Sequence, residues 1–207
     1  MEELSVDFVG IVDGGGGGTD AEDGIIERTV DEYTNDRVTK VGDYAFYGCT
    51  ALTEISFPSV TGIGDHAFYG CDSMVTVSFP VTGVIYSNAF DGCVALTEIS
   101  FPVAESIGNY AFNGCNKLTT ANFPAVVSIY LNAFRGCSTM TALIIGNVNQ
   151  VCYLSNSNAF TDTPISNGTG YIYVPDALVD SYKAASNWST YAKQIKPLSE
   201  YTGGETS

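Results

Sequence analysis

Cysteine is the residue type with the most varied chemistry in this chain, and five of its six cysteines follow one spacing. They lie 22 residues apart, at Cys49, Cys71, Cys93, Cys115 and Cys137. Metal sites usually take ligands from Cys-x-x-Cys pairs, and the sequence contains none. Disulfides along the series would have to meet strict distance limits and would strain a regular stack. We therefore predict reduced, metal-free, buried thiols that pack as small apolar groups. Cys152, which lies off the series, is predicted to be the most exposed thiol.

The single histidine, His66, is a weak candidate for catalysis. A nucleophilic site needs a base beside a nucleophile and a third group that orients the base, and no neighbour of His66 supplies these roles. The same position in the other copies of the surrounding pattern carries Tyr44, Asn88, Tyr110 and Asn132. We expect this column to be polar and outward in every turn. The sequence therefore predicts no enzyme, no metal site and no cofactor.

Charge disfavours several classes of partner. The 207-residue chain has a formal net charge of −15, and residues 1–36 carry eleven acidic side chains against one basic. Nucleic acids and anionic membranes are bound by clustered Lys and Arg, so neither is an expected partner. The glycine run in segment 13–24 lacks the Lys-Ser/Thr of a phosphate loop, and its acidic residues lack calcium-loop spacing. This segment is interpreted as a linker.

Localisation is only partly constrained by the sequence. No apolar run reaches 18 residues, so no membrane-spanning helix is expected. The acidic start M-E-E-L-S-V-D-F lacks the basic region of a secretory signal. We expect the protein to be extracellular, on a cell surface or in a virion. It would reach that location either through a signal peptide that has been removed or by another export route.

The cysteines and the histidine belong to a unit that returns every 22 residues. It reads A-F-Y-G-C-T-A-L-T-E-I-S-F-P at 45–58 and recurs from residues 67, 89, 111 and 133. Such a period is typical of a stacked leucine-rich solenoid. The L-x-x-I-x-F-P part alternates like a strand, and stacking about 4.8 Å apart would align equal residues in core ladders. Phe160 follows Phe134 by 26 residues, which predicts a four-residue insertion in the last turn.

Three regions are predicted along the chain. Residues 1–24 hold a lone strand at 4–12 and the linker, 25–175 form the solenoid with an incomplete first turn at 25–44, and 176–207 form a helical cap and tail. In the cap, Leu178, Tyr182 and Ala185 lie at helical spacing, as do Trp188, Tyr191 and Ile195. Asp176 is predicted as the helix N-cap and Asn187 as the division between two short helices. The cap would cover the exposed edge of the last turn.

The unit A-F-x-x-C-x-x-L-x-x-I-x-F-P-x-V-x-x-I-G-x-x resembles the BspA-like leucine-rich repeat family. The joint recurrence of A-F, G-C and F-P over residues 25–175 carries the resemblance, together with the closing segment I-Y-V-P-D-A-L-V-D-S-Y-K-A-A-S-N-W-S-T-Y-A-K-Q-I. The resemblance implies a solenoid of parallel strands and short helical or 3₁₀ turns. It also implies a surface protein that adheres to host proteins or partner cells, or a product of a prophage structural gene. It implies no catalysis.

Two surfaces of the predicted solenoid could make contacts. The outward strand positions are mostly hydroxyl-bearing, and in the fifth unit they are Thr141, Ala142 and Ile144. The turn edge is richer in tyrosine, which gives contact area at little entropic cost. We predict binding there, although the tyrosines could equally just cover the solenoid flank. The predicted binding residues are Tyr47, Tyr69, Tyr86, Tyr110, Tyr130, His66 and Arg135.

Two functions are compatible with these patterns. The first is a non-enzymatic adhesion module on a bacterial surface or virus particle that binds a protein or cell-surface glycan. The alternative is a structural subunit of a phage virion or appendage, assembling as a homo-oligomer or with other chains through residues 4–12.

Overall fold

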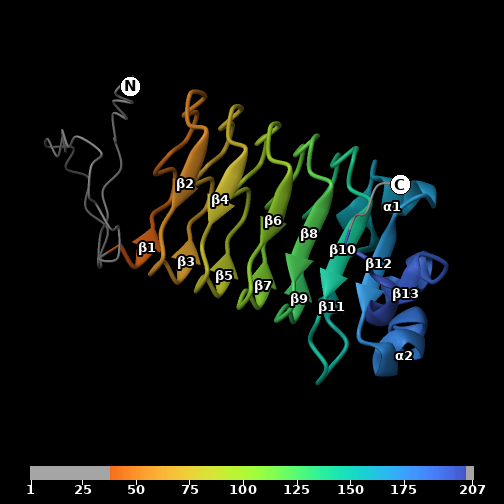
Figure 1. The fold of residues 1–207 in the computed structure, drawn as a ribbon. Coiled ribbons are helices and arrows are strands. Elements are labelled where there is room, and N and C mark those ends of the chain that lie inside the picture. The colour runs from red at the N-terminus through yellow and green to blue at the C-terminus, as the bar shows by residue number, and fades with distance from the viewer. Residues whose placement is uncertain (1–37, 204–207) are drawn as a thin grey trace, which may run out of the picture.

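In the computed structural model, which describes residues 38–203, short strands stack along one axis into a solenoid (Figure 1). With one exception, between β4 (Thr76–Ser78) and β6 (Glu98–Ser100), the equivalent strands of successive turns pair in parallel. Val41, Ile63 and Ile85 are successive partners. One face is a six-stranded sheet made of β1 (Lys40–Val41), β3 (Gly62–Ile63), β5 (Val84–Ile85), β7 (Ser106–Ile107), β9 (Ser128–Ile129) and β11 (Tyr153–Leu154). The predicted parallel β-solenoid is confirmed. The predicted strand at 4–12, the linker and most of the first turn at 25–44 lie outside the described residues.

The opposite face carries the longer strands, and it is interrupted once. Its main part is a five-stranded sheet of β6 (Glu98–Ser100), β8 (Thr120–Phe123), β10 (Ala142–Ile145), β12 (Tyr171–Val174) and β13 (Ile195–Pro197). The remaining two strands, β2 (Glu54–Ser56) and β4 (Thr76–Ser78), pair only with each other. At the break Val77 is half-buried, whereas Ile55 and Ile99 in the same column are buried. The strand pairing of this face stops between β4 and β6.

Phenylalanine ladders fill the space between the two faces. Phe112 is fully buried and stacks on Phe90 at 5.1 Å and on Phe134 at 5.4 Å between ring centroids. A second ladder of Phe101 and Phe123 packs at steep angles against the first. The column of equal residues follows from the strict period, and it confirms the predicted core.

The cysteine series forms a third buried column, with a specific role for the thiol. Cys71 Sγ donates a hydrogen bond to the Phe46 carbonyl of the preceding turn at 3.2 Å, and the next three cysteines repeat this contact. Burial raises the pKa of Cys71 to about 12, so the thiol stays neutral. Cys49, at the start of the series, is only half-buried. The predicted burial holds for the other four.

The prediction that Cys152 is the most exposed thiol is wrong, because its side chain is only 1% exposed. It precedes β11, which the C-terminal segment covers, and burial raises its pKa to about 12. The insertion before it is confirmed: a loop separates β10 from β11, yet β11 keeps its register with β9. Phe160, in the 3₁₀ helix η2 (Ser157–Phe160), stacks on Phe134 at 5.8 Å.

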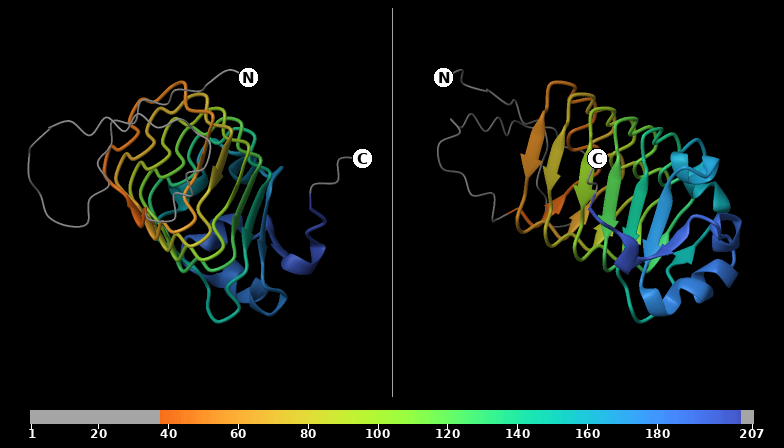
Figure 2. Two further views of the ribbon diagram at one scale, coloured as in Figure 1. Left: turned by 60° about the vertical axis from the view of Figure 1, so that its left-hand side comes forward. Right: turned by 45° about the vertical axis from the view of Figure 1, so that its right-hand side comes forward.

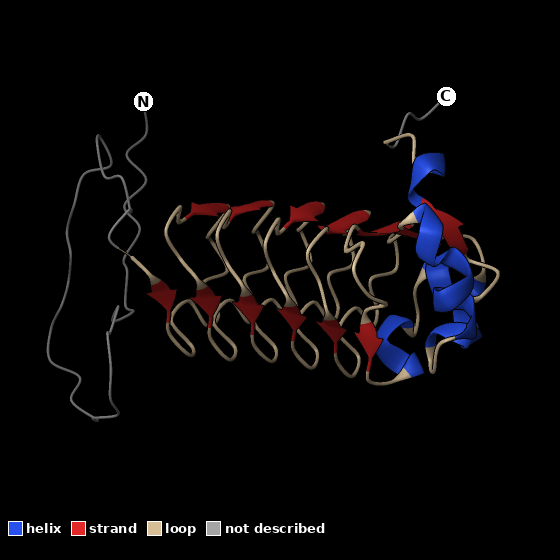
Figure 3. Ribbon diagram, turned by 90° about the horizontal axis from the view of Figure 1, so that it is seen from below, coloured by secondary structure: helices blue, strands red, loops and turns tan. Residues whose placement is uncertain are grey.

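The C-terminal segment is built of short helices that gather at one end of the solenoid (Figure 3). In chain order the helices that follow η2 are α1 (Pro164–Asn167), η3 (Asp176–Leu178), α2 (Val179–Ala184), η4 (Trp188–Tyr191) and η5 (Leu198–Glu200). None of the helices within residues 38–203 has the length and hydrophobicity needed to cross a membrane. Viewed nearly along the axis, the turns almost superpose, with these helices at the far end (Figure 2).

Side chains of this segment bond to the free backbone around β11. Trp188 Nε1 donates to the Cys152 carbonyl at 2.6 Å, and the Cys152 amide donates to the Tyr182 hydroxyl at 2.9 Å. Asn187 Nδ2 donates to the Leu154 carbonyl at 2.8 Å. These three side chains occupy the place that a further strand would take, and so satisfy backbone groups that would otherwise be left unpaired.

Details of this segment differ from the sequence-based expectation. Asn187, with a φ of 64°, does separate α2 from η4. Asp176 is not an N-cap; hydrogen bonding by the Ser199 side chain, followed by the bond that the Ser199 amide donates to Oδ1 at 3.1 Å, lowers the pKa of the carboxyl. Ile195 lies in β13 rather than in a helix. Its strand ends at Pro197, which limits further pairing at the sheet edge.

Candidate functional site

The turns between the two faces are held in register by their own backbone hydrogen bonds. The amides of Tyr44, Phe46 and Gly48 donate to the carbonyls of Asp65, Ala67 and Tyr69 of the next turn at 2.7–2.9 Å. The same pattern recurs in the turns that follow. Side chains at equal positions therefore line up in columns along this side of the molecule.

Two such columns make up the surface that we call the turn flank. The first column contains Tyr44, His66, Asn88, Tyr110 and Asn132. The second, three residues further in each turn, contains Tyr47, Tyr69, Asp91, Asn113 and Arg135. Five of the seven predicted binding residues belong to the turn flank.

The first column adopts a left-handed backbone conformation. Its φ values lie between 55° and 59°, a region that favours glycine and tolerates asparagine but penalises bulky residues. Four residues later each turn has a second left-handed position, and there the five turns use glycine, from Gly48 to Gly136. The chain thus keeps tyrosine and histidine at positions where glycine would be less strained.

Four rings at the N-terminal end of the turn flank form a compact cluster, which we call the aromatic block. Tyr44 stacks on His66 with ring centroids 4.9 Å apart, and Tyr47 stacks on Tyr69 at the same distance. The two stacks touch, because Tyr44 lies 5.8 Å from Tyr47 and His66 lies 5.7 Å from Tyr69. Tyr44 is 56% exposed and Tyr47 is 53% exposed. The block presents ring surface to solvent rather than burying it in the core.

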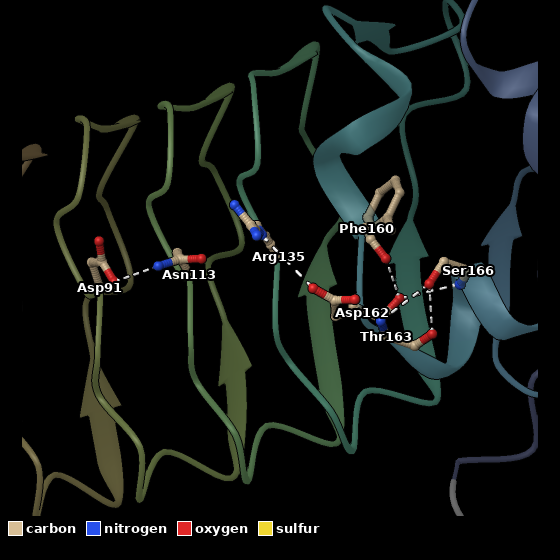
Figure 4. A network of polar contacts seen from close by, with 7 residues as sticks. All are labelled: Asp91, Asn113, Arg135, Phe160, Asp162, Thr163 and Ser166. Atoms are coloured by element: carbon tan, nitrogen blue, oxygen red, sulfur yellow. Dashed lines mark hydrogen bonds and ion pairs between the residues drawn. The ribbon is translucent and has the colours of Figure 1, made fainter.

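Beyond the aromatic block the turn flank becomes polar (Figure 4). Asp91 accepts from Asn113 Nδ2 at 2.8 Å through Oδ1 and from Asn88 Nδ2 at 2.9 Å through Oδ2. Further along, Arg135 Nε lies 3.8 Å from Asp162 Oδ2, and both side chains are at least half exposed. An exposed pair of this kind is weak, so Arg135 remains accessible.

Figure 4 also shows how the last turn replaces the cysteine column. Thr163 occupies that position, fully buried, and its hydroxyl donates to the Phe160 carbonyl at 2.6 Å. The same hydroxyl accepts from the Ser166 amide at 3.2 Å and so caps α1. This group is structural.

The predicted binding residues do not form one edge. Tyr47, Tyr69 and His66 meet in the aromatic block, whereas Tyr110 lies between Asn88 and Asn132 in the first column, and Arg135 lies three turns beyond Tyr69. Tyr86 directly follows β5 and Tyr130 directly follows β9, so both belong to a separate column. In that column the turns before them carry Gly64 and Gly108. The expectation that the His66 column faces outward in every turn is also wrong, because Asn132 is only 8% exposed.

Sequence reasoning missed a second group of rings, one exposed and two half-buried, on β12 and its surroundings. Tyr173 lies 4.9 Å from Tyr201, and Lys196 Nζ lies 5.6 Å from the centroid of Tyr171. Tyr171 and Tyr173 are in register with Ala142 and Ile144 on β10, which are buried rather than outward as predicted. The alternation Y-I-Y in β12, beside β13 with its Lys196, is the sequence pattern from which this group could have been predicted.

The turn flank offers ring faces, amides and a few charged groups, which are the means of binding a partner. Within residues 38–203 no group of three or more His, Cys, Asp or Glu side chains could hold a metal ion. His66 Nδ1 is buried against its neighbours and has no hydrogen-bond partner in the described part of the chain. Its ring therefore contributes to the flank through stacking.

The comparisons with known proteins agree with this architecture. The model of the BspA type leucine rich repeat region matches residues 32–141 in six copies. No curated protein sequence matches the chain. Among solved structures, a leucine-rich repeat protein from Eubacterium ventriosum is 29% identical with a TM-score of 0.54, over 62% of this chain and 35% of that one.

Two further solved structures were found in the comparison, and the first is similar in fold. The pneumococcal vaccine antigen PcpA is 18% identical with a TM-score of 0.55, over 76% of this chain and 38% of PcpA. The T. pallidum leucine rich repeat protein is 25% identical with a TM-score of 0.45, over 70% of this chain and 75% of that one. The chain thus spans little more than a third of the Eubacterium protein and of PcpA. The repeat unit, the parallel solenoid and the family match coincide, and the chain belongs to the BspA-type leucine-rich repeat family.

Proposed function

We propose that this protein is a non-enzymatic recognition module that attaches to a protein or glycan on a cell surface through its turn flank. The observation that carries the proposal is the aromatic block, in which two of the four rings, those of Tyr44 and His66, stand on left-handed turn positions. Tyr44 and His66 are kept where glycine would be less strained, and their rings are stacked and accessible. Backbone strain of this kind clusters at functional sites, and tyrosine is enriched at contact surfaces.

Display on a bacterial surface or a virus particle is part of the proposal, and membership of the BspA-type family supports it. Residues 1–24 would act as the tether and residues 176–207 as the cap. A solenoid presents similar contacts in each turn, so a single copy would bind weakly. Many copies on one particle would raise the apparent affinity through effective concentration.

The test is adhesion of beads that carry many copies of the full chain to mucosal cells and bacterial cells. A variant with Tyr44, Tyr47 and Tyr69 changed to serine removes most of the aromatic block while leaving the core ladders intact. We expect it to lose at least about 90% of bead attachment, since each lost contact is multiplied over many copies. Tyr153→Ser is the matched control, because Tyr153 is 60% exposed and lies outside the turn flank.

Two results would decide against the proposal. If the block variant attaches as well as the parent, the turn flank is not the binding surface. If the parent attaches to neither kind of cell, a structural role in an assembly becomes the better explanation. Circular dichroism of each variant establishes that the fold is retained.

A further inference from the structure

Charge is distributed unevenly along the described solenoid. Residues 38–110 contain one basic side chain, Lys40, against seven acidic ones, whereas residues 111–203 contain five basic and four acidic. The half that holds the aromatic block therefore carries a net charge of −6, and the half that holds the C-terminal helices carries +1. An acidic surface of this kind attracts cationic groups over about one Debye length.

Four of the seven carboxylates accompany the aromatic block. Asp43 and Asp65 directly precede Tyr44 and His66, Asp72 is exposed in the turn that holds Tyr69, and Asp91 follows Tyr69 in its column. Asp43 accepts from the Asp65 amide and Asp65 accepts from the Ser87 amide, both at 2.9 Å. Within residues 38–203 neither of the two ion pairs involves these carboxylates. Backbone and amide donors orient the carboxylates of Asp43, Asp65 and Asp91, and none of the four carboxylates is in a described ion pair.

The same protein shows how its tyrosines and carboxylates hold a cation. On the opposite half, Lys196 Nζ lies 5.6 Å from the centroid of Tyr171 and 3.2 Å from Glu200 Oε2. A ring face within about 6 Å and a carboxylate thus share one ammonium group. The aromatic block has four rings and four nearby carboxylates, but no described cation lies over any of its rings.

We propose that the aromatic block and its carboxylates bind a lysine- or arginine-rich segment of a partner protein. This inference rests on the proposed function and names the chemistry of the partner. Ammonium and guanidinium groups lie against the exposed surfaces of Tyr44 and Tyr47, while Asp43 and Asp72 supply the opposite charge. Neutral sugars also stack on tyrosine and can donate hydrogen bonds to carboxylates, but, unlike cations, they gain no attraction from the net charge of −6 on this half.

The experiment measures binding of the full chain to a fluorescent peptide of alternating lysine and glycine by anisotropy. A peptide of alternating glutamate and glycine gives the background. We expect the lysine peptide to bind, and to bind at least about tenfold more weakly when salt is raised from about 50 mM to about 300 mM. Replacing both Tyr44 and Tyr47 by serine should weaken binding about tenfold or more at low salt, and Asp72→Asn by about threefold.

Matched controls separate this site from general charge attraction. Tyr153→Ser removes a similarly exposed ring, and Asp180→Asn removes an exposed carboxylate on α2, so both should bind like the parent. Equal binding by the parent and the tyrosine variant, or equal losses in Asp72→Asn and Asp180→Asn, would overturn the site. So would salt-independent binding to neutral oligosaccharide beads with no binding to the lysine peptide. If the peptide fails to bind while beads still adhere to cells through the block, only the cationic partner is refuted and the proposed function stands.

Discussion

Replacing Phe112 with alanine tests whether the phenylalanine ladder sets the stability of the solenoid. Phe112 is fully buried, stacks on Phe90 and Phe134, and packs at an angle against Phe101 and Phe123. Truncation of a buried phenylalanine costs about 3–5 kcal/mol, and the loss of four ring contacts places the expected cost near the upper value. For a domain of this size a cost near 5 kcal/mol corresponds to a fall in melting temperature of about 10–20 °C.

Urea unfolding followed by circular dichroism measures the free energy, with thermal unfolding as a second observable. Phe112→Leu keeps most of the volume and should cost clearly less than the alanine variant. Tyr47→Ala removes a ring of the neighbouring, exposed column and should change stability by less than about 1 kcal/mol. If Phe112→Ala unfolds within about 1 kcal/mol of the parent, the ladder does not carry the stability that its burial implies.

Three further predictions concern the thiols and the C-terminal segment. Cys49 should react first with a thiol reagent, because Cys71 and Cys152 are buried and their pKa values are raised to about 12. Mass spectrometry that finds Cys152 modified as fast as Cys49 would contradict this. Because these pKa values are raised on folding, the unfolded thiols lose protons first. The contribution of these thiols to stability should be constant below pH about 8.5, and stability should fall as the pH rises from there toward 12, as melting curves at several pH values would show. Trp188→Phe should cost about 1–3 kcal/mol, since the buried Cys152 carbonyl loses its donor, and removal of 176–207 should cause aggregation visible by light scattering. A monomeric truncated protein with an unchanged melting temperature would exclude the capping role.

The features that repeat with the period could be predicted from the sequence. A spacing of 22 residues fixes which residues stack, so the burial of Phe112 and the insertion before Phe160 followed directly. Contacts made outside the period could not be predicted in this way. Cys152 is buried because Tyr182 and Trp188, 30 and 36 residues later, bond to its backbone.

The candidate site was predicted only in part, for a related reason. Residue type alone marked the tyrosines as candidate binding residues, but residues of one type need not lie in the same column. Tyr86 and Tyr130 therefore lie apart from the turn flank. The left-handed conformation at Tyr44 and His66 could not be predicted from the sequence of one repeat, because no glycine stands at these positions to indicate it. Every turn shares this backbone conformation, so what distinguishes the site is the pair of stacked rings that two successive turns place on it.

The interruption between β4 and β6 has a consequence for the solenoid under tension. If the solenoid is pulled by its two ends, force runs along the axis, and the turns are loaded in series. The hydrogen bonds between turns lie along that axis, so the interface with the fewest of them yields first. At β4 and β6 the long-strand sheet contributes none, while β5 and β7 and the turn backbone still hold. We expect mechanical rupture to begin there, which would divide the molecule into a short piece bearing the aromatic block and a longer piece that keeps the cap.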